Sequence, residues 1–156
     1  MEAFKALKVK PFRQFVLARF FLIFSVQMQN LILSWMVYGI TKDPLSLGLI
    51  GIAEIIPFLS VVLFAGNMAD KFSRKKMVFW ATLLITSSSV FLYYLVANQE
   101  NIAQPLLLTG YYTIVFVIGF GRGFFGPASQ AMVPTLVPAD VFANATTWNT
   151  TAFHIA

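Results

Sequence analysis

Residues 66–77, GNMADKFSRKKM, carry four of the eleven lysine and arginine residues of an otherwise apolar chain. An apolar run lies on either side of this segment, at 45–65 and at 77–97. A helix needs about 20 mostly apolar residues to cross a bilayer core of about 30 Å, and both runs are that long. Two more runs, 15–40 and 105–131, meet the same criterion. The sequence therefore predicts an all-α membrane protein with four membrane-spanning helices.

A fifth apolar stretch at 141–156 is shorter than these four runs. Sixteen residues rise only about 24 Å in a helix, which is too little to cross the bilayer core. We therefore expect a truncated fifth helix.

The composition excludes several classes of function. Apolar residues make up 58% of the 156 positions and charged residues 11%, against roughly 25% charged residues in a soluble domain. The chain has no cysteine and one histidine, His154, which excludes disulfides, thiolate metal sites and multi-histidine metal centres. Because no His, Asp and Glu cluster at ligand spacing, we expect no metal, no cofactor and no enzymatic activity.

The basic residues predict the orientation in the membrane. Loop 66–77 carries four of them and so does the leader 1–14, namely Lys5, Lys8, Lys10 and Arg13. The opposite side carries only Lys42, so the N-terminus is expected to be cytoplasmic. This sidedness accounts for the net charge of +5 without nucleic acid, and the expected partners are anionic lipids, at about 1 kcal/mol per basic residue. Asn144 and Asn149 match the glycosylation pattern, but they follow a cytoplasmic loop, so we expect no glycan.

Three charged residues fall inside the predicted spans, where such residues are functional candidates. Arg19 is only about 6 Å into its helix and is expected to extend back to the cytoplasmic surface. Glu54 is mid-span, where a carboxyl favours its neutral form and can carry a proton; the alternative is a hydrogen-bonded glutamate that only packs helices. Arg122 follows Gly119, which favours close helix contact, and its alternative role is to bind backbone carbonyls at a kink. Depths of about 14 Å for Glu54 and about 25 Å for Arg122 leave their pairing open.

A polar stripe runs along the first span. Gln27, Asn30 and Ser34 are spaced by three and four residues, so they share one helix face. Such a stripe turns toward protein or water, and two interpretations remain open. The residues form hydrogen bonds between helices, or they line a solute cavity.

The loop between the second and third spans has more order than orientation requires. An acidic residue adds nothing to positive-inside sorting, and a glycine allows another backbone to come close. The loop contains the series Gly66-x-x-x-Asp70-Lys71-x-Ser73-Arg74-Lys75. This series resembles the loop signature between the second and third helices of the major facilitator superfamily. Ser73 departs from the signature, because the family usually has glycine there.

This resemblance implies the N-terminal part of a twelve-helix fold, with the leader at 1–14 and a partial six-helix bundle at 15–156. It also implies that the loop is a cytoplasmic latch, in which Asp70 faces a helix end outside this chain and Arg74 pairs with Asp140. Arg122, followed four residues later by Gly126, resembles the fourth-helix signature of the superfamily. That likeness implies a place beside the central cavity, with a role in proton or substrate handling.

Residues 27–76, from QMQNLILSW to FSRKK, and residues 127–138, PASQAMVPTLVP, are similar to the bacterial branch that contains macrolide and siderophore exporters. The likeness implies proton-driven efflux of an amphipathic small molecule across the bacterial cytoplasmic membrane by a transporter that is monomeric at full length. The fragment alone is expected to be inactive. The alternatives are an importer of a small solute in the same superfamily and a small four-helix membrane scaffold.

Overall fold

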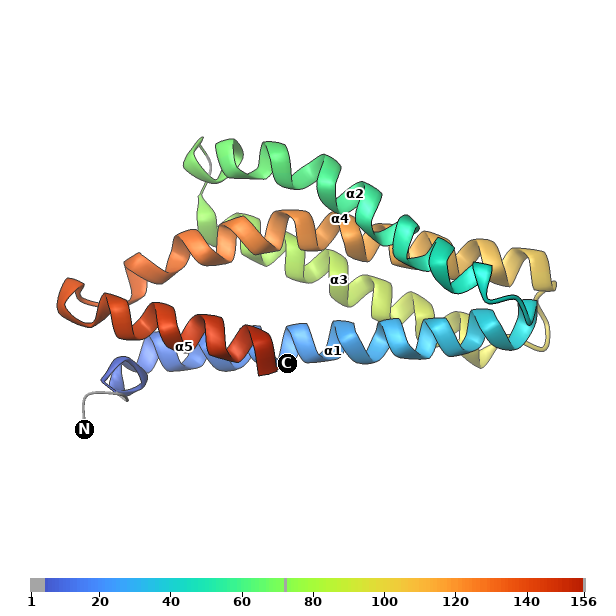
Figure 1. The fold of residues 1–156 in the computed structure, drawn as a ribbon, viewed down its shortest axis with the longest axis horizontal. Helices are drawn as coiled ribbons and strands as arrows, with labels where there is room; N and C mark the ends of the chain where they lie inside the picture. Colours follow the sequence, from blue (N-terminus) through green and yellow to red (C-terminus); the bar gives the residue numbers. More distant parts are fainter. Residues whose placement is uncertain (1–4, 72, 156) are drawn as a thin grey trace.

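A computed structural model of the chain describes residues 5–71 and 73–155, without the side chains of residues 67, 69–71, 153 and 154. Within these ranges every regular element is a helix, and Figure 1 shows the course of the chain. The helices are η1 (Ala6–Lys8), α1 (Lys10–Thr41), α2 (Leu45–Lys71), α3 (Arg74–Ala97), α4 (Gln104–Leu136), η2 (Ala139–Val141) and α5 (Phe142–Ile155).

Among the described residues, four helices are long and apolar enough to cross a membrane, in α1 to α4. This confirms the predicted all-α membrane class with four candidate spans, although the helices run past the apolar limits. The first helix begins at Lys10, inside the expected leader, because Pro11 in its first turn is a favoured start. The fourth continues to Leu136, past the expected end at 131. The division into a leader and a partial six-helix bundle stays a prediction.

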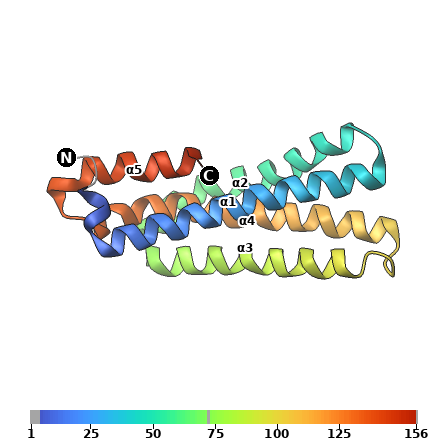
Figure 2. The same ribbon diagram turned by 90° about the horizontal axis from the view of Figure 1, so that it is seen from below.

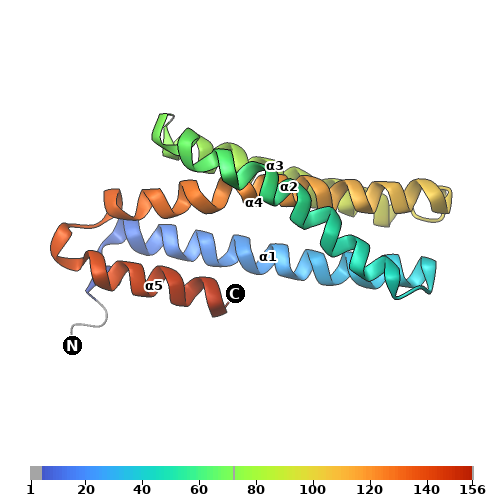
Figure 3. The ribbon, with the colours of Figure 1, turned by 45° about the horizontal axis from the view of Figure 1, so that its top comes forward.

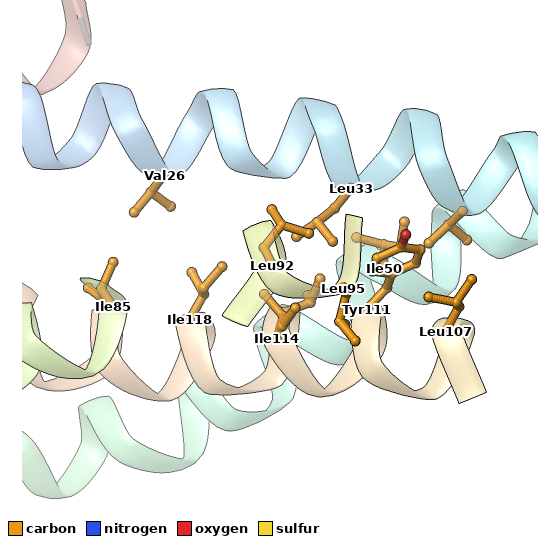
Figure 4. Packing of buried hydrophobic residues seen from close by; sticks show 12 residues of the cluster. Val26, Leu33, Ile50, Ile85, Leu92, Leu95, Leu107, Tyr111, Ile114 and Ile118 are labelled. Atoms are coloured by element: carbon orange, nitrogen blue, oxygen red, sulfur yellow. The ribbon is translucent and has the colours of Figure 1, made fainter. Parts of the chain in front are cut away.

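The centre of the bundle is α4, which contacts α1, α2, α3 and α5. In Figure 3, α2 crosses α4 obliquely, whereas Figure 2 shows α3 at one edge of the bundle and α5 at the other. Figure 4 shows the main core, in which Leu33 of α1, Leu92 and Leu95 of α3 and Ile114 of α4 meet. Burying such side chains against one another fixes the packing of the other three spans around α4.

A second apolar cluster lies at the end of the bundle that carries the N-terminus. It joins η1 and α1 to the end of α4 and to α5 through Ala6, Phe12, Val16, Val133, Val137, Val141 and Ala145. The backbone N–H of Ala6 donates a hydrogen bond of 3.1 Å to Oδ1 of Asn144, which is 138 residues away in the sequence. The fifth helix is therefore docked on the start of the first.

The turn between α1 and α2 at the opposite end of the bundle is closed by local hydrogen bonds. Lys42 caps α1 in the left-handed region, with φ of 52°, and its N–H donates to the carbonyl of Tyr38 at 2.9 Å. Oδ1 of Asp43 accepts from the N–H of Leu45 at 3.0 Å, which satisfies a free donor in the first turn of α2. This turn fixes the start of α2 beside α1.

Candidate functional site

Glu54, Arg122 and Asn30 meet from three different helices at a half-buried place in the bundle, where the side chain of Arg122 is 36% exposed and that of Glu54 is 17% exposed. Nη1 of Arg122 in α4 forms an ion pair with Oε1 of Glu54 in α2. Nδ2 of Asn30 in α1 donates a hydrogen bond of 3.0 Å to Oε2 of the same carboxylate. Both carboxylate oxygens are thus bound, and the pairing that the sequence left open is formed.

The ion pair forms because the backbones of α2 and α4 come into direct contact beside it. A Cβ built on Gly119 would overlap the carbonyl oxygen of Glu54 and would lie 3.0 Å from Cγ of Pro57. One turn later, a Cβ on Gly123 would lie 2.8 Å from Cβ of Val61. Only glycine permits this approach, so Gly119 and Gly123 form a glycine seam between the two helices.

The seam also sets the two charged groups at one level. The backbone of Glu54 lies opposite Gly119, and Arg122 is three residues further along α4. Three residues rise about 4.5 Å, and a helical side chain leans toward the N-terminus of its own helix. The arginine therefore reaches back along α4 to the carboxylate, and closes the depth difference that counting from the helix ends suggests.

The α2 backbone next to Glu54 is interrupted by Pro57, which is buried within the helix. Proline lacks the N–H that would bond to the carbonyl four residues earlier, so the carbonyl of Ala53 has no such helical partner. In a membrane helix this leaves a local polar group beside the carboxylate. The site thus combines a charged pair with a locally weakened helix.

Two cavities meet at Arg122. The smaller, of about 270 Å³, is lined by Gly51, Ile55 and Phe58 together with Glu54 and Arg122. The larger, of about 380 Å³, lies between α1, α2 and α4. Apolar side chains make most of its wall, and its polar groups are Arg19, Gln27, Arg122 and Gln130. The volume is within the range of small-molecule sites, and the mix of an apolar wall with a few polar groups is typical of them.

The members of the polar stripe on α1 have different surroundings. Asn30 binds Glu54 across the helix interface, whereas Gln27 lines the larger cavity. Ser34 is half-buried and lines neither cavity. Each of the two interpretations of the stripe therefore describes one of its residues, and the functional roles of all three stay predictions.

The expectation that Arg19 extends to the membrane surface is wrong. Its side chain is only 5% exposed, and Nη1 donates a hydrogen bond of 2.6 Å to Oδ1 of Asn149 in α5. The fifth helix packs against α1 and supplies a polar partner at that depth, so the arginine has no need to reach the headgroups. The glycosylation pattern at Asn149 falls on a side chain that is only 7% exposed.

The structure describes only part of loop 66–77, for which the sequence predicts a latch. The side chains of Asp70 and Lys71 lie outside the described residues, and Lys75 is exposed. Among the described residues, a Cβ on Gly66 would meet nothing within 4 Å, so none of them makes the close backbone approach, and the role of Gly66 stays a prediction. Gly126 is equally open.

The predicted pair of Arg74 with Asp140 is not formed. Nη1 of Arg74 instead donates a hydrogen bond of 2.8 Å to the carbonyl oxygen of Ala131, and Asp140 is exposed. The reason is that a carbonyl oxygen near the end of α4 lies within reach of the arginine at the start of α3 and accepts its hydrogen bond instead. The contact ties this loop to α4 rather than to the next loop.

Sequence analysis also missed a polar contact between α1 and α3. Oγ of Ser89 in α3 donates a hydrogen bond of 2.9 Å to Oε1 of Gln29 in α1, and Gln29 is only 5% exposed. Gln29 lies off the face of the predicted stripe, so spacing alone did not include it. A signal was available, because both residues are polar positions within apolar spans, where such groups seek one another.

Comparisons with known proteins identify the family of this chain. The family model described as transmembrane secretion effector matches residues 1–156, the whole chain. A Na(+), Li(+), K(+)/H(+) antiporter from Planococcus maritimus is 32% identical over 120 residues, which cover 70% of this chain and 27% of the antiporter. The chain thus spans about a quarter of the length of that relative. No solved structure matches. The family match over residues 1–156 agrees with the four apolar spans found among the described residues, and this chain belongs to the transmembrane secretion effector family of the major facilitator superfamily.

Proposed function

We propose that this chain is the N-terminal part of a proton-coupled secondary transporter, which exports an amphipathic small molecule by alternating access. It lies in the bacterial cytoplasmic membrane with its N-terminus inside, as the basic residues of 1–14 and 66–77 favour. The family description, secretion effector, supports the direction of transport. The similarity to an antiporter that exchanges cations for protons supports the coupling.

The observation that carries the proposal is the carboxylate of Glu54, which Arg122 and Asn30 hold from two other helices. A carboxyl can bind and release a proton. When it binds one, it loses the charge that attracts Arg122, and the ion pair between α2 and α4 weakens. Proton binding at this point therefore changes how three helices are held together, as coupling to a rocking motion requires.

The larger cavity supports an amphipathic cargo. Its wall is mostly apolar, with Phe58 and Phe125 among its residues, and these would contact an apolar body. Gln27, Gln130 and Arg122 supply hydrogen-bond donors for a polar end. Because Arg122 also lines the smaller cavity with Glu54, cargo and proton would act on the same arginine.

The test is Glu54→Gln in the full transporter that contains this chain, assayed for export of lipophilic cations, macrolides and siderophores from proteoliposomes under a proton gradient. Glutamine keeps the size and the hydrogen-bonding groups but cannot carry a proton, so we expect proton-driven export to fall at least tenfold. Glu100→Gln is the matched control, because Glu100 is exposed between α3 and α4, and it should export normally. Wild-type export by Glu54→Gln would refute the coupling role.

A second candidate is exchange of monovalent cations for protons, which the named activity of the Planococcus maritimus relative favours. The same proteoliposomes, loaded with a pH-sensitive dye, distinguish the two. A pH change on addition of Na⁺, Li⁺ or K⁺ supports cation exchange. A pH change only with an amphipathic compound supports the first proposal.

A further inference from the structure

An open apolar groove lies between α2, α3 and α4, away from the ion pair. Its volume is about 600 Å³, and its lining includes Met68 of α2, Lys76, Trp80 and Leu84 of α3, and Phe120 and Phe124 of α4. Trp80 is 64% exposed and Phe120 is 40% exposed. A large apolar surface of this kind marks a contact with another molecule or with the membrane interior.

The groove has a charged end and an apolar length. Lys76, Trp80 and Leu84 are spaced by four residues, so they follow one another along one face of α3. From Lys76 to Leu84 the helix rises about 12 Å. The rings of Phe120 and Phe124, whose centroids are 5.3 Å apart, form the facing wall. The cation thus stands at the membrane boundary, and the apolar wall extends inward from it.

The groove opens on the side of α4 that faces away from the proposed transport site. Phe120 and Phe124 each lie two residues from Arg122, and two residues turn a helix by about 200°. A segment that covered the cavities at Arg122 would therefore leave this groove uncovered. Figure 2 shows α3 along the edge of the bundle, opposite α5.

We propose that this groove binds one anionic phospholipid, with the phosphate at Lys76 and an acyl chain along Trp80, Leu84, Phe120 and Phe124. Charge complementarity selects the occupant. Arg74 and Lys75 precede Lys76, so this end of the groove attracts negative charge and disfavours a basic protein segment. The apolar part accepts hydrocarbon, and anionic lipids are concentrated in the cytoplasmic leaflet, which this loop is expected to face.

The tryptophan in the groove is the probe. The full transporter is reconstituted in phosphatidylcholine vesicles that contain a small fraction of phospholipid brominated on its acyl chains, either phosphatidylglycerol or phosphatidylcholine. Bromine quenches tryptophan on contact, and the signal of Trp80 is the difference between the protein and its Trp80→Phe variant. We expect brominated phosphatidylglycerol to quench Trp80 more strongly than brominated phosphatidylcholine at equal content.

The variants test the position of the charge. Lys76→Gln should lower the preference for the anionic lipid about fivefold, the factor that corresponds to one basic residue at an anionic surface, and Lys76→Arg should retain it. The matched control is Lys75→Gln, which removes the same charge from an adjacent exposed residue that does not line the groove.

Three outcomes would overturn the proposal. Equal quenching by both lipids means that the groove has no anionic preference. An equal effect of Lys75→Gln and Lys76→Gln means a diffuse surface attraction rather than a site. No quenching by either lipid means that protein covers the groove. None of these depends on transport, so the result stands apart from the test of Glu54.

Discussion

Replacement of Gly119 by alanine tests the glycine seam directly. The new Cβ would overlap the carbonyl oxygen of Glu54 and lie 3.0 Å from the carbonyl carbon of the same residue. Both atoms belong to the backbone, so no side-chain rotation relieves the contact and α2 must move away from α4. Overpacking of this kind costs about 1–3 kcal/mol.

Gly126→Ala is the matched control on the same helix, because a Cβ there meets nothing within 4 Å. Both variants replace glycine by alanine within α4, and both gain the same helix propensity, up to about 1 kcal/mol. The difference between their free energies of unfolding is therefore the overpacking cost alone. We expect Gly119→Ala to be less stable than Gly126→Ala by about 1–3 kcal/mol.

The assay is reversible unfolding of the purified protein in detergent micelles by increasing fractions of sodium dodecyl sulfate, followed by tryptophan fluorescence. Equal stability of the two variants, within about 0.5 kcal/mol, would refute the backbone contact between α2 and α4. A second consequence follows for the ion pair. If α2 moves away, the carboxylate of Glu54 moves from Arg122, so Gly119→Ala should also reduce proton-driven export.

Two further predictions use the same unfolding measurement. Asn149→Leu removes the oxygen that accepts a hydrogen bond from the buried Arg19, so we expect the free energy of unfolding to fall by about 1.5–3 kcal/mol. Asn149→Asp keeps an acceptor and should be at least as stable as the parent. Unchanged stability of Asn149→Leu would contradict this role of Asn149. Arg74→Leu removes the hydrogen bond to the carbonyl of Ala131 and should cost about 1 kcal/mol, whereas Asp140→Asn should change stability by less than about 0.5 kcal/mol. A larger effect of Asp140→Asn would instead support the ion pair between Arg74 and Asp140.

The spans were predictable because each one follows from a local property. A run of about 20 apolar residues has one stable place in a membrane, whatever its neighbours are. The isolated glutamate in the second span was predictable for the same reason, since its cost in lipid does not depend on the details of packing. Sequence therefore identified Glu54 and Arg122 as two separate candidates.

The contacts between these residues were not predictable, because they depend on how far one helix is displaced along another. The pairing of Glu54 with Arg122 needs the offset that the seam at Gly119 imposes. Arg19 was misplaced because its partner is Asn149, a residue 130 positions away. Arg74 was paired with Asp140, the only acid in the loop between the fourth and fifth spans, whereas its partner is a backbone carbonyl, which has no signature in the sequence.

The docking of the fifth helix on the start of the first has a consequence for biogenesis. The N–H of Ala6 donates its hydrogen bond to Asn144, which is synthesised 138 residues later. At roughly 5–20 residues per second, a ribosome needs about 7–28 s to make that stretch. During this interval the side chains at the start of α1, including Phe12 and Val16, have no apolar partners from α5. A chaperone or the insertion machinery can bind the N-terminal segment during this time. In a pulse-labelled nascent chain, the start of α1 should lose its protease sensitivity only after residue 149 has entered the membrane.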